Sequence, residues 1–83
     1  MNNYPCFESN THYASTSEDP YIATINDLPS AQVCQDRCRS EAACSYWSYG
    51  YSTFPRGWRC FLKQTKKGKM YGAGYTSGPD TCL

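Results

Sequence analysis

Residues 30–49 read Ser-Ala-Gln-Val-Cys-Gln-Asp-Arg-Cys-Arg-Ser-Glu-Ala-Ala-Cys-Ser-Tyr-Trp-Ser-Tyr, and this stretch decides the fold. Ser30 is a good helix N-cap, and the ten residues after it contain neither proline nor glycine. Apolar residues recur at intervals of three and four and form a narrow stripe, widened by one valine: Ala31, Val33, Cys34, Cys38 and Ala42. The stretch therefore predicts one helix over residues 31–41, with Cys34 and Cys38 one turn apart on the same face.

Several short stretches around this helix alternate between apolar and polar residues or are rich in β-branched and aromatic ones, which is the pattern of strands. The predicted strands are residues 21–25, 44–51, 59–63 and 70–76. In the third of these, Cys60 and Leu62 share one face, and Arg59 and Lys63 share the other. Both faces of the second carry an aromatic residue, so the pattern leaves open which face points inward.

The remaining segments read as loops and turns. Residues 9–20 form a polar run that predicts a long loop, and glycine and proline predict turns at residues 52–57 and 77–80. Gly72 and Gly74 interrupt a strand pattern and indicate a bulge. Short strands with an antiparallel pattern around one helix predict an α+β fold.

The chain is too short, at 83 residues, to bury a large core, and its 40% of hydrophobic residues include eight Tyr and six Cys. An even number of cysteines in so short a chain is typical of an oxidised, secreted scaffold. Zinc is the alternative, but no C-x-x-C pair is present and His12 is the only histidine. The composition therefore favours three disulfides and no metal, and it leaves all fifteen pairings open.

The length predicts a single domain over residues 1–83, with residues 1–3 belonging to a linker or to the artificial start of an excised fragment. No segment is long and apolar enough to span a membrane, and no signal peptide is visible. We expect the parent protein to carry its own signal peptide, because the cysteines indicate an extracellular domain.

An enzymatic site would need a positioned acid or base, a nucleophile or a metal. His12 lies in the predicted loop and is expected to be solvated there. The one adjacent acidic pair, Glu18-Asp19, precedes Pro20 and suits a turn or an N-cap better than acid–base chemistry. No cysteine is left over as a thiolate, and neither G-x-S-x-G nor a phosphate-binding glycine loop is present. The sequence predicts no enzyme and no cofactor.

Charge is unevenly distributed, although the net charge is only +1. Residues 1–55 carry six acidic and two basic groups, whereas residues 56–69 carry six basic groups and no acid. On adjacent strand ends and their turn, these groups would form a positive patch for sulfated glycans or an acidic protein face. The alternative is a lysine-rich hairpin whose charges keep it soluble and protect its edge. The six residues are Arg56, Arg59, Lys63, Lys66, Lys67 and Lys69.

The aromatic residues divide into core and surface candidates. Trp47, Tyr49 and Phe61 are expected to pack in the core, where their size compensates for missing aliphatic residues. Trp58 follows a predicted turn and is the aromatic residue best placed for exposure. Exposed Trp and Tyr side chains are efficient binding groups because they offer rigid area with a polar tip. Trp58 and the six basic residues are therefore the candidate ligand-binding side chains. Partial exposure is also expected for Tyr51, Tyr71 and Tyr75.

The order of these motifs resembles that of the apple domain, also called the PAN module. In that family a helix carrying C-x-x-x-C precedes a cysteine that opens an aromatic strand, then a C-x-L-K strand and a Ser-Gly turn before the last cysteine. The matching segments are Cys34-Gln-Asp-Arg-Cys38, Cys44-Ser-Tyr-Trp-Ser-Tyr49, Cys60-Phe-Leu-Lys63 and Ser77-Gly78 ahead of Cys82. Cys6 stands near the amino terminus, as in the six-cysteine variety of the family.

The resemblance implies a small disulfide-rich fold in which a short antiparallel sheet wraps one helix. It also implies the pairs Cys6–Cys82, Cys34–Cys60 and Cys38–Cys44. Its implied function is that of a secreted adhesive module that recognises carbohydrate or protein on host cells, as one unit of a tandem array. The high content of Tyr and Ser makes the sequence most similar to apple modules of microneme adhesive proteins in coccidian parasites.

The alternative function is a protein-docking apple module in a secreted serine-protease zymogen or growth factor. The expected partners are a cell-surface glycan or protein and neighbouring apple modules of the parent chain. Neither nucleic-acid binding nor membrane insertion is expected.

Overall fold

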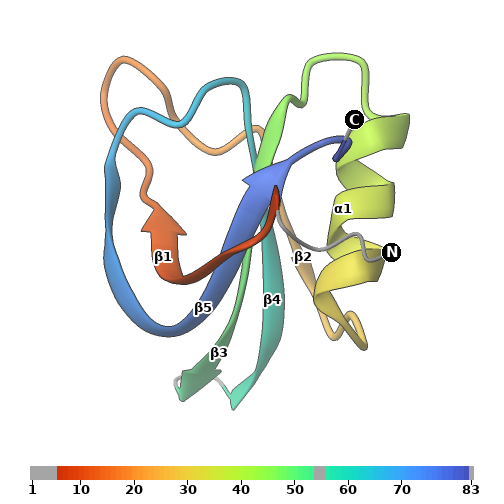
Figure 1. Cartoon of the computed structure of the whole chain (residues 1–83), viewed down its shortest axis with the longest axis vertical. Coiled ribbons are helices and arrows are strands. Elements are labelled where there is room, and N and C mark those ends of the chain that lie inside the picture. The colour runs from red at the N-terminus through yellow and green to blue at the C-terminus, as the bar shows by residue number, and fades with distance from the viewer. Residues whose placement is uncertain (1–5, 54–55, 83) are drawn as a thin grey trace.

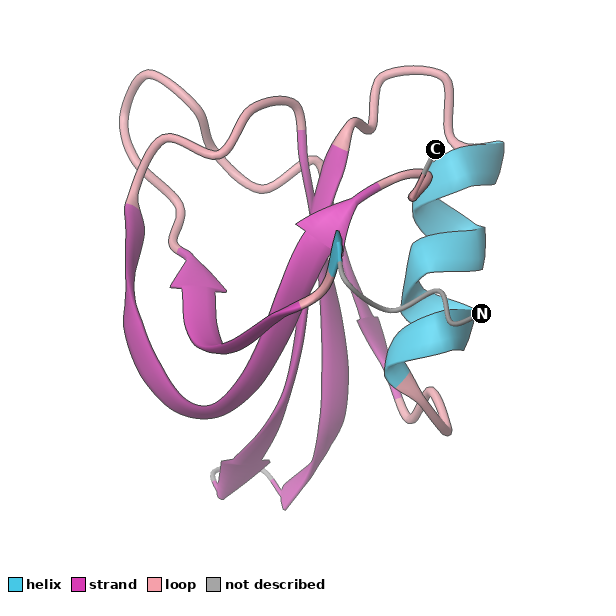
Figure 2. Ribbon diagram, viewed as in Figure 1, coloured by secondary structure: helices cyan, strands magenta, loops and turns pink. Residues whose placement is uncertain are grey.

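A computed structural model of the chain describes residues 6–53 and 56–82. These residues form, in order, β1 (Glu8–Tyr13), β2 (Ala23–Asn26), α1 (Ala31–Ser40), β3 (Tyr46–Thr53), β4 (Arg56–Lys63) and β5 (Lys69–Pro79). The strands make one antiparallel sheet in the order β1-β5-β3-β4-β2, and α1 packs against one side of it (Figure 1 and Figure 2). The predicted α+β fold, with one helix and a short antiparallel sheet, is confirmed.

The helix α1 begins where the sequence predicts. The Ser30 hydroxyl accepts a hydrogen bond from the Val33 amide (3.2 Å), as an N-cap does. At the other end the Glu41 amide donates to the carbonyl of Cys38 (3.0 Å), and the helix stops one residue before the predicted boundary. Cys34 and Cys38 are fully buried, so they lie on the side of the helix that faces the sheet. Ala42, also predicted for the apolar stripe, lies beyond the end of the helix and is exposed.

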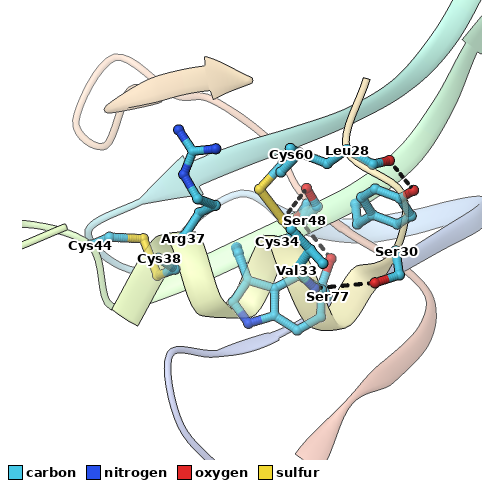
Figure 3. Close-up of a disulfide and its surroundings, with 12 residues drawn as sticks. Leu28, Ser30, Val33, Cys34, Arg37, Cys38, Cys44, Ser48, Cys60 and Ser77 are labelled. Atoms are coloured by element: carbon cyan, nitrogen blue, oxygen red, sulfur yellow. Dashed lines mark hydrogen bonds between the residues drawn. A yellow bond between two sulfur atoms is a disulfide. The ribbon is translucent and has the colours of Figure 1, made fainter. Parts of the chain in front are cut away.

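Disulfides join this helix to the sheet and the two ends of the domain to each other. The pairs are Cys6–Cys82, Cys34–Cys60 and Cys38–Cys44. They are the pairs that the resemblance implies, and they engage all six cysteines of the chain. Figure 3 shows the bond between α1 and β4 beside the one that closes the short loop after α1.

The main core lies between α1 and the central strands. Trp47 and Tyr49 of β3 are buried there, as predicted. The indole nitrogen of Trp47 donates to the carbonyl of Pro79 (2.6 Å), and the Tyr49 hydroxyl donates to the carbonyl of Leu28 (2.6 Å). Buried aromatic rings, whose polar atoms are hydrogen-bonded, thus replace the missing aliphatic residues. The buried members of this core are Cys34, Cys38, Cys44, Trp47, Tyr49, Cys60 and Leu62.

Residues 9–13, predicted as part of a loop, belong to the strand β1 instead. The sequence shows no alternation there, because β1 takes its partners from the far end of the chain, with Glu8 opposite Ser77. The Ser77 hydroxyl donates to the carbonyl of Thr11 (2.6 Å), and Ser48 Oγ accepts from the amide of Tyr13 (2.8 Å). Buried hydroxyl groups therefore fix a strand that local propensity does not reveal.

The Ser77-Gly78 pair, predicted as a turn, lies inside β5. Gly78 allows a close approach there, because a Cβ atom would come within 3.1 Å of the Trp47 ring. The irregularity expected near Gly72 and Gly74 is present, since the β1–β5 register shifts between Ser9 and Thr11. Of the turn predicted at residues 52–57, residues 52–53 and 56–57 instead pair with each other as the ends of β3 and β4, and residues 54–55 lie outside the described residues. The predicted linker, residues 1–3, also lies outside them.

Candidate binding surface

The structure divides the expected binding residues between the two ends of β4. One group lies in the first half of β4, beside the hairpin with β3, and consists of Arg56, Trp58 and Arg59. The other lies at the turn after β4 and consists of Lys66, Lys67 and Lys69. Eight residues make up β4, so its ends are roughly 23 Å apart at about 3.3 Å per residue. The basic residues therefore form two separate groups instead of one patch.

Lys63 belongs to neither group, and its expected exposure is wrong. Its side chain is fully buried. Its ammonium donates to the carbonyls of Ala14 (2.5 Å), Asp19 (2.8 Å) and Lys67 (3.0 Å), and it lies 2.9 Å from the Asp19 carboxylate. A buried ammonium is tolerated only where such oxygen atoms replace its water. Lys63 thus joins the segment after β1 to the turn after β4, and it is not available to a surface ligand.

Acidic side chains share the surface of the lysine group. The Lys69 ammonium lies 2.8 Å from the Glu8 carboxylate, and the Lys67 ammonium lies 3.6 Å from that of Glu18. The third ammonium, that of Lys66, lies 5.7 Å from the centre of an aromatic ring. Exposed pairs of this kind add little stability, but they neutralise part of the charge. The turn after β4 therefore presents mixed charge, which weakens it as an anion-binding site.

The group at the other end of β4 adjoins a pair of exposed aromatic rings. Tyr51 and Trp58 stand opposite each other on β3 and β4, with ring centres 5.4 Å apart, and they are 43% and 44% exposed. The buried ring of Tyr49 stacks on the Trp58 indole at 5.1 Å and 13°. Such packing holds an aromatic side chain in one orientation. We call the exposed residues Tyr51, Arg56 and Trp58 the hairpin surface.

The hairpin surface continues the helix-facing side of the sheet beyond the helix. Side chains two residues apart on a strand share a face, so Tyr51 follows the buried Tyr49, and Trp58 precedes the buried Cys60. The helix begins only at Ala31, and the hairpin of β3 and β4 projects past that end of it (Figure 1). The aromatic side of the sheet is therefore longer than the helix that covers it.

The turn after β2 fastens the backbone under Trp58. Asp27 adopts a left-handed conformation (φ 63°), and its amide donates to the carbonyl of Trp58 (2.8 Å). A Cβ atom at Gly57 would lie 3.2 Å from the Asp27 carboxylate, and Gly57 itself has φ +145°. A glycine is thus required where the two segments meet. The strand β4, which carries Trp58, is therefore held by the turn after β2 as well as by its pairing with β3.

The other aromatic candidates have different surroundings. Tyr71 is 73% exposed on β5, whereas Tyr75 is half-buried. Phe61, predicted for the main core, lies on the opposite side of β4 beside His12, with ring centres 5.5 Å apart. His12, predicted as a solvated loop residue, lies in β1 and contacts Tyr75 at 4.3 Å between ring centres. These contacts join residues about 50 to 60 positions apart, which no local pattern reveals.

Among residues 6–53 and 56–82, no helix is long and apolar enough to cross a membrane. In the same part of the chain, no group of three or more His, Cys, Asp or Glu side chains is arranged to hold a metal ion. The surface of these described residues has no pocket.

The sequence model of the PAN domain family matches residues 6–82, from the first cysteine to the last. No curated protein sequence matches the chain. The family match spans the helix, all five strands and the three disulfides described above. The chain belongs to the PAN domain family.

Proposed function

We propose that this PAN domain is an extracellular adhesive module that recognises carbohydrate or protein on a host-cell surface through its hairpin surface. PAN domains serve as protein-binding and carbohydrate-binding modules. The observation that carries the proposal is the exposed Tyr51–Trp58 pair, whose rings lie 5.4 Å apart and rest on the buried Tyr49.

Rigidity and composition both suit the hairpin surface to binding. Tyr, Trp and Arg are the side chains that most often dominate the energy of an interface. Because Trp58 is already packed between two tyrosine rings, ligand binding costs little side-chain entropy. The ring faces suit an apolar ligand face, and the exposed guanidinium of Arg56 suits an oxygen-rich one.

The disulfides support the extracellular part of the proposal, because such bonds persist in oxidising compartments. We further propose that the parent protein carries several such modules, as microneme adhesive proteins of coccidian parasites do. In a tandem array, several weak sites give strong attachment through avidity. One open surface of modest area is then sufficient.

The second candidate function is docking of a partner protein within a secreted serine-protease zymogen or growth factor. The same hairpin surface supports it, because exposed Tyr, Trp and Arg serve protein partners equally well. The neighbouring sequence separates the two: repeated PAN modules support adhesion, and a serine-protease domain supports docking.

The test compares two aromatic substitutions at different places on the same domain. Trp58→Ala is expected to weaken binding to cultured-cell monolayers at least tenfold, because it removes the centre of the hairpin surface. Tyr71→Ala is the matched control, since Tyr71 is more exposed (73%) but lies on β5. It is expected to change binding less than twofold.

Thermal unfolding of both variants checks that the domain still folds, because Trp58 also stacks on Tyr49. A glycan array and glycosidase-treated cells then separate a carbohydrate ligand from a protein one. Unchanged binding by folded Trp58→Ala would overturn the hairpin surface as the binding site. Equal loss in both variants would overturn it as well.

A further inference from the structure

A second aromatic cluster lies on the side of the sheet that faces away from α1. Its centre is the imidazole of His12, whose ring centre lies 4.3 Å from that of Tyr75, 5.5 Å from that of Phe61 and 6.2 Å from that of Tyr21. Tyr21 in turn stacks on Phe61 at 4.7 Å. The cluster therefore joins β1, β4, β5 and the segment before β2 around one histidine.

The hydrogen bonding of His12 favours the neutral form of its ring. Its Nε2 lies 2.7 Å from the Tyr21 hydroxyl, which can donate or accept. Its Nδ1 is buried and has no hydrogen-bond partner among the described residues. A neutral imidazole can leave that nitrogen as a bare acceptor, whereas an imidazolium must place a donor there. Protonation would thus create a buried N–H without an acceptor.

The charged groups around the cluster also oppose an imidazolium. Lys63 is buried, and its ammonium lies 5.9 Å from the centre of the Tyr21 ring. Asp19, the acid of that network, is bound by this ammonium (2.9 Å) and by the Thr65 hydroxyl (2.5 Å). Burial lowers the pKa of His12, and the positive charge of Lys63 lowers it further. Burial raises the pKa of Tyr21, so this hydroxyl remains neutral through the acidic range.

Tyr75 connects this cluster to the hairpin surface. Its ring lies directly against Gly50 of β3, where a Cβ atom would overlap three of its carbon atoms. Gly50 stands between Tyr49 and Tyr51 in the strand, so the ring presses on the back of the strand whose front carries the hairpin surface. Two contacts, His12 with Tyr75 and Tyr75 with Gly50, thus connect His12 to the residue next to Tyr51.

We propose that His12 is an acid-sensitive latch, whose protonation releases Tyr75 from Gly50, loosens β3 and thereby lowers the affinity of the hairpin surface for its ligand. The release of ligand rests on the proposed function, but the opening of the cluster does not. The latch is closed at neutral pH and opens as the pH falls through the pKa of His12, which lies below the ordinary value of 6.5. With this latch, a disulfide-bonded module binds its ligand at a cell surface and releases it in an acidic compartment.

The opening is tested without any ligand, on the domain as it stands. His12 is the one histidine of the chain, so its imidazole proton signals report its titration directly by nuclear magnetic resonance. Because folding holds the ring neutral, stability is complete above the ordinary pKa of 6.5 and falls as the pH drops below it. The folding equilibrium constant is expected to fall roughly threefold or more between pH 7.5 and 5.5. Over the same pH range, the folding equilibrium constant of His12→Phe is expected to stay constant.

A second histidine position supplies the control. Tyr71→His, combined with His12→Phe, places the one histidine at a site that is 73% exposed in the wild type. It should titrate near 6.5 without moving the amide signals of Gly50 and Tyr51. In the wild type, those two signals are expected to shift with the same midpoint as His12. A histidine that titrates without moving them, or stability equally flat in wild type and His12→Phe, would overturn the latch.

The final arm measures attachment to cultured-cell monolayers at pH 7.5 and at a pH about one unit below the His12 midpoint that the titration gives. The wild type is expected to detach at least fivefold more at the lower pH, and His12→Phe is expected to stay attached. If the amide signals move but attachment is independent of pH, the coupling to binding is wrong and the opening alone stands. If Trp58→Ala binds normally, the proposed site fails independently of the opening.

Discussion

The ammonium of Lys63 lies 2.9 Å from the carboxylate of Asp19, and both side chains are buried. The Thr65 hydroxyl donates to the same carboxylate (2.5 Å). Burial by itself raises the pKa of Asp19, but the hydrogen bonds from Thr65 and Lys63 and the charge of Lys63 lower it more, so the pKa is lowered overall. The Asp19 carboxylate is therefore ionised at neutral pH. Its pairing with Lys63 joins two connecting segments that lie 44 residues apart in sequence.

Replacing Lys63 is expected to destabilise the domain strongly. Lys63→Met keeps the length of the side chain but leaves the Asp19 carboxylate buried without its cation, which costs about 3–5 kcal/mol. Urea denaturation measures the loss. Lys67→Met is the control, because its ion pair is exposed and worth no more than about 1 kcal/mol. Adding Asp19→Asn to Lys63→Met should recover part of the loss; fully additive losses would contradict a coupled pair.

The stabilising effect of Asp19 is expected to decrease at low pH. A carboxyl group whose pKa is lowered by folding adds stability above its ordinary value of 3.8 and loses it as the pH falls through the lowered pKa. The wild type should therefore exceed Asp19→Asn in stability at pH 5, and the difference should shrink steadily below pH 3.8. Urea midpoints from pH 5 to pH 2.5 measure it. A constant difference over this range would show that the Asp19 charge is not responsible.

Gly50→Ala is expected to destabilise the domain by about 1–3 kcal/mol, because the added methyl group must displace the Tyr75 ring. Gly74→Ala is the contrasting variant. No atom lies within 4 Å of its added Cβ, but Gly74 has φ +81°, so its cost comes from the backbone alone. Replacing Tyr75 by Leu should relieve the strain in Gly50→Ala and leave Gly74→Ala unchanged. Thermal unfolding of the two double variants distinguishes the causes.

Local sequence patterns predicted the helix α1 and its buried face well. An N-cap, an apolar stripe and two cysteines one turn apart lie within thirteen residues, so they consistently predict a helix with one buried face. Trp47 and Tyr49 were likewise predicted for the core, because large aromatic side chains were expected to replace the missing aliphatic residues there. The pairing of the cysteines, in contrast, came from the family resemblance, since spacing alone allows fifteen solutions.

Contacts between distant segments account for what the sequence could not predict. The strand β1 reads as a polar loop, because its hydrogen-bonding partners lie in β5, more than 50 residues away. Lys63 reads as an exposed member of a basic run, and only its distant oxygen partners make its burial favourable. His12 reads as solvated for the same reason. The exposure of Trp58 could be predicted because it follows a turn, but its stacking on Tyr49 needed the register of β3 and β4.

Removal of the terminal disulfide is expected to cost more than removal of the short one. Cys6–Cys82 closes a loop of 76 residues and Cys38–Cys44 a loop of six. Loop-closure entropy then gives losses of about 4–5 kcal/mol and about 2 kcal/mol, respectively. Paired serine substitutions compared by urea denaturation measure both. A greater loss at Cys38–Cys44 would mean that packing at the end of α1, and not chain entropy, sets the cost.

The lysine group at the turn after β4 is expected to be dispensable for binding. Changing Lys66, Lys67 and Lys69 together to Ala should alter attachment to cultured-cell monolayers less than about twofold, because exposed pairs with acids already offset much of their charge. The turn also lies roughly 23 Å from the hairpin surface, beyond the screening length of about 8 Å in physiological salt.

Arg56→Ala is the matched change of charge at the other end of β4, and it should weaken attachment at least fivefold, because Arg56 is exposed beside the Tyr51–Trp58 pair. Attachment measured from 50 to 500 mM salt completes the comparison. The triple lysine variant should keep the salt dependence of the wild type, whereas Arg56→Ala should reduce it. Loss of attachment in the triple variant, with Arg56→Ala unaffected, would instead place the ligand on the lysine turn. That outcome would make a sulfated or otherwise anionic ligand the better explanation.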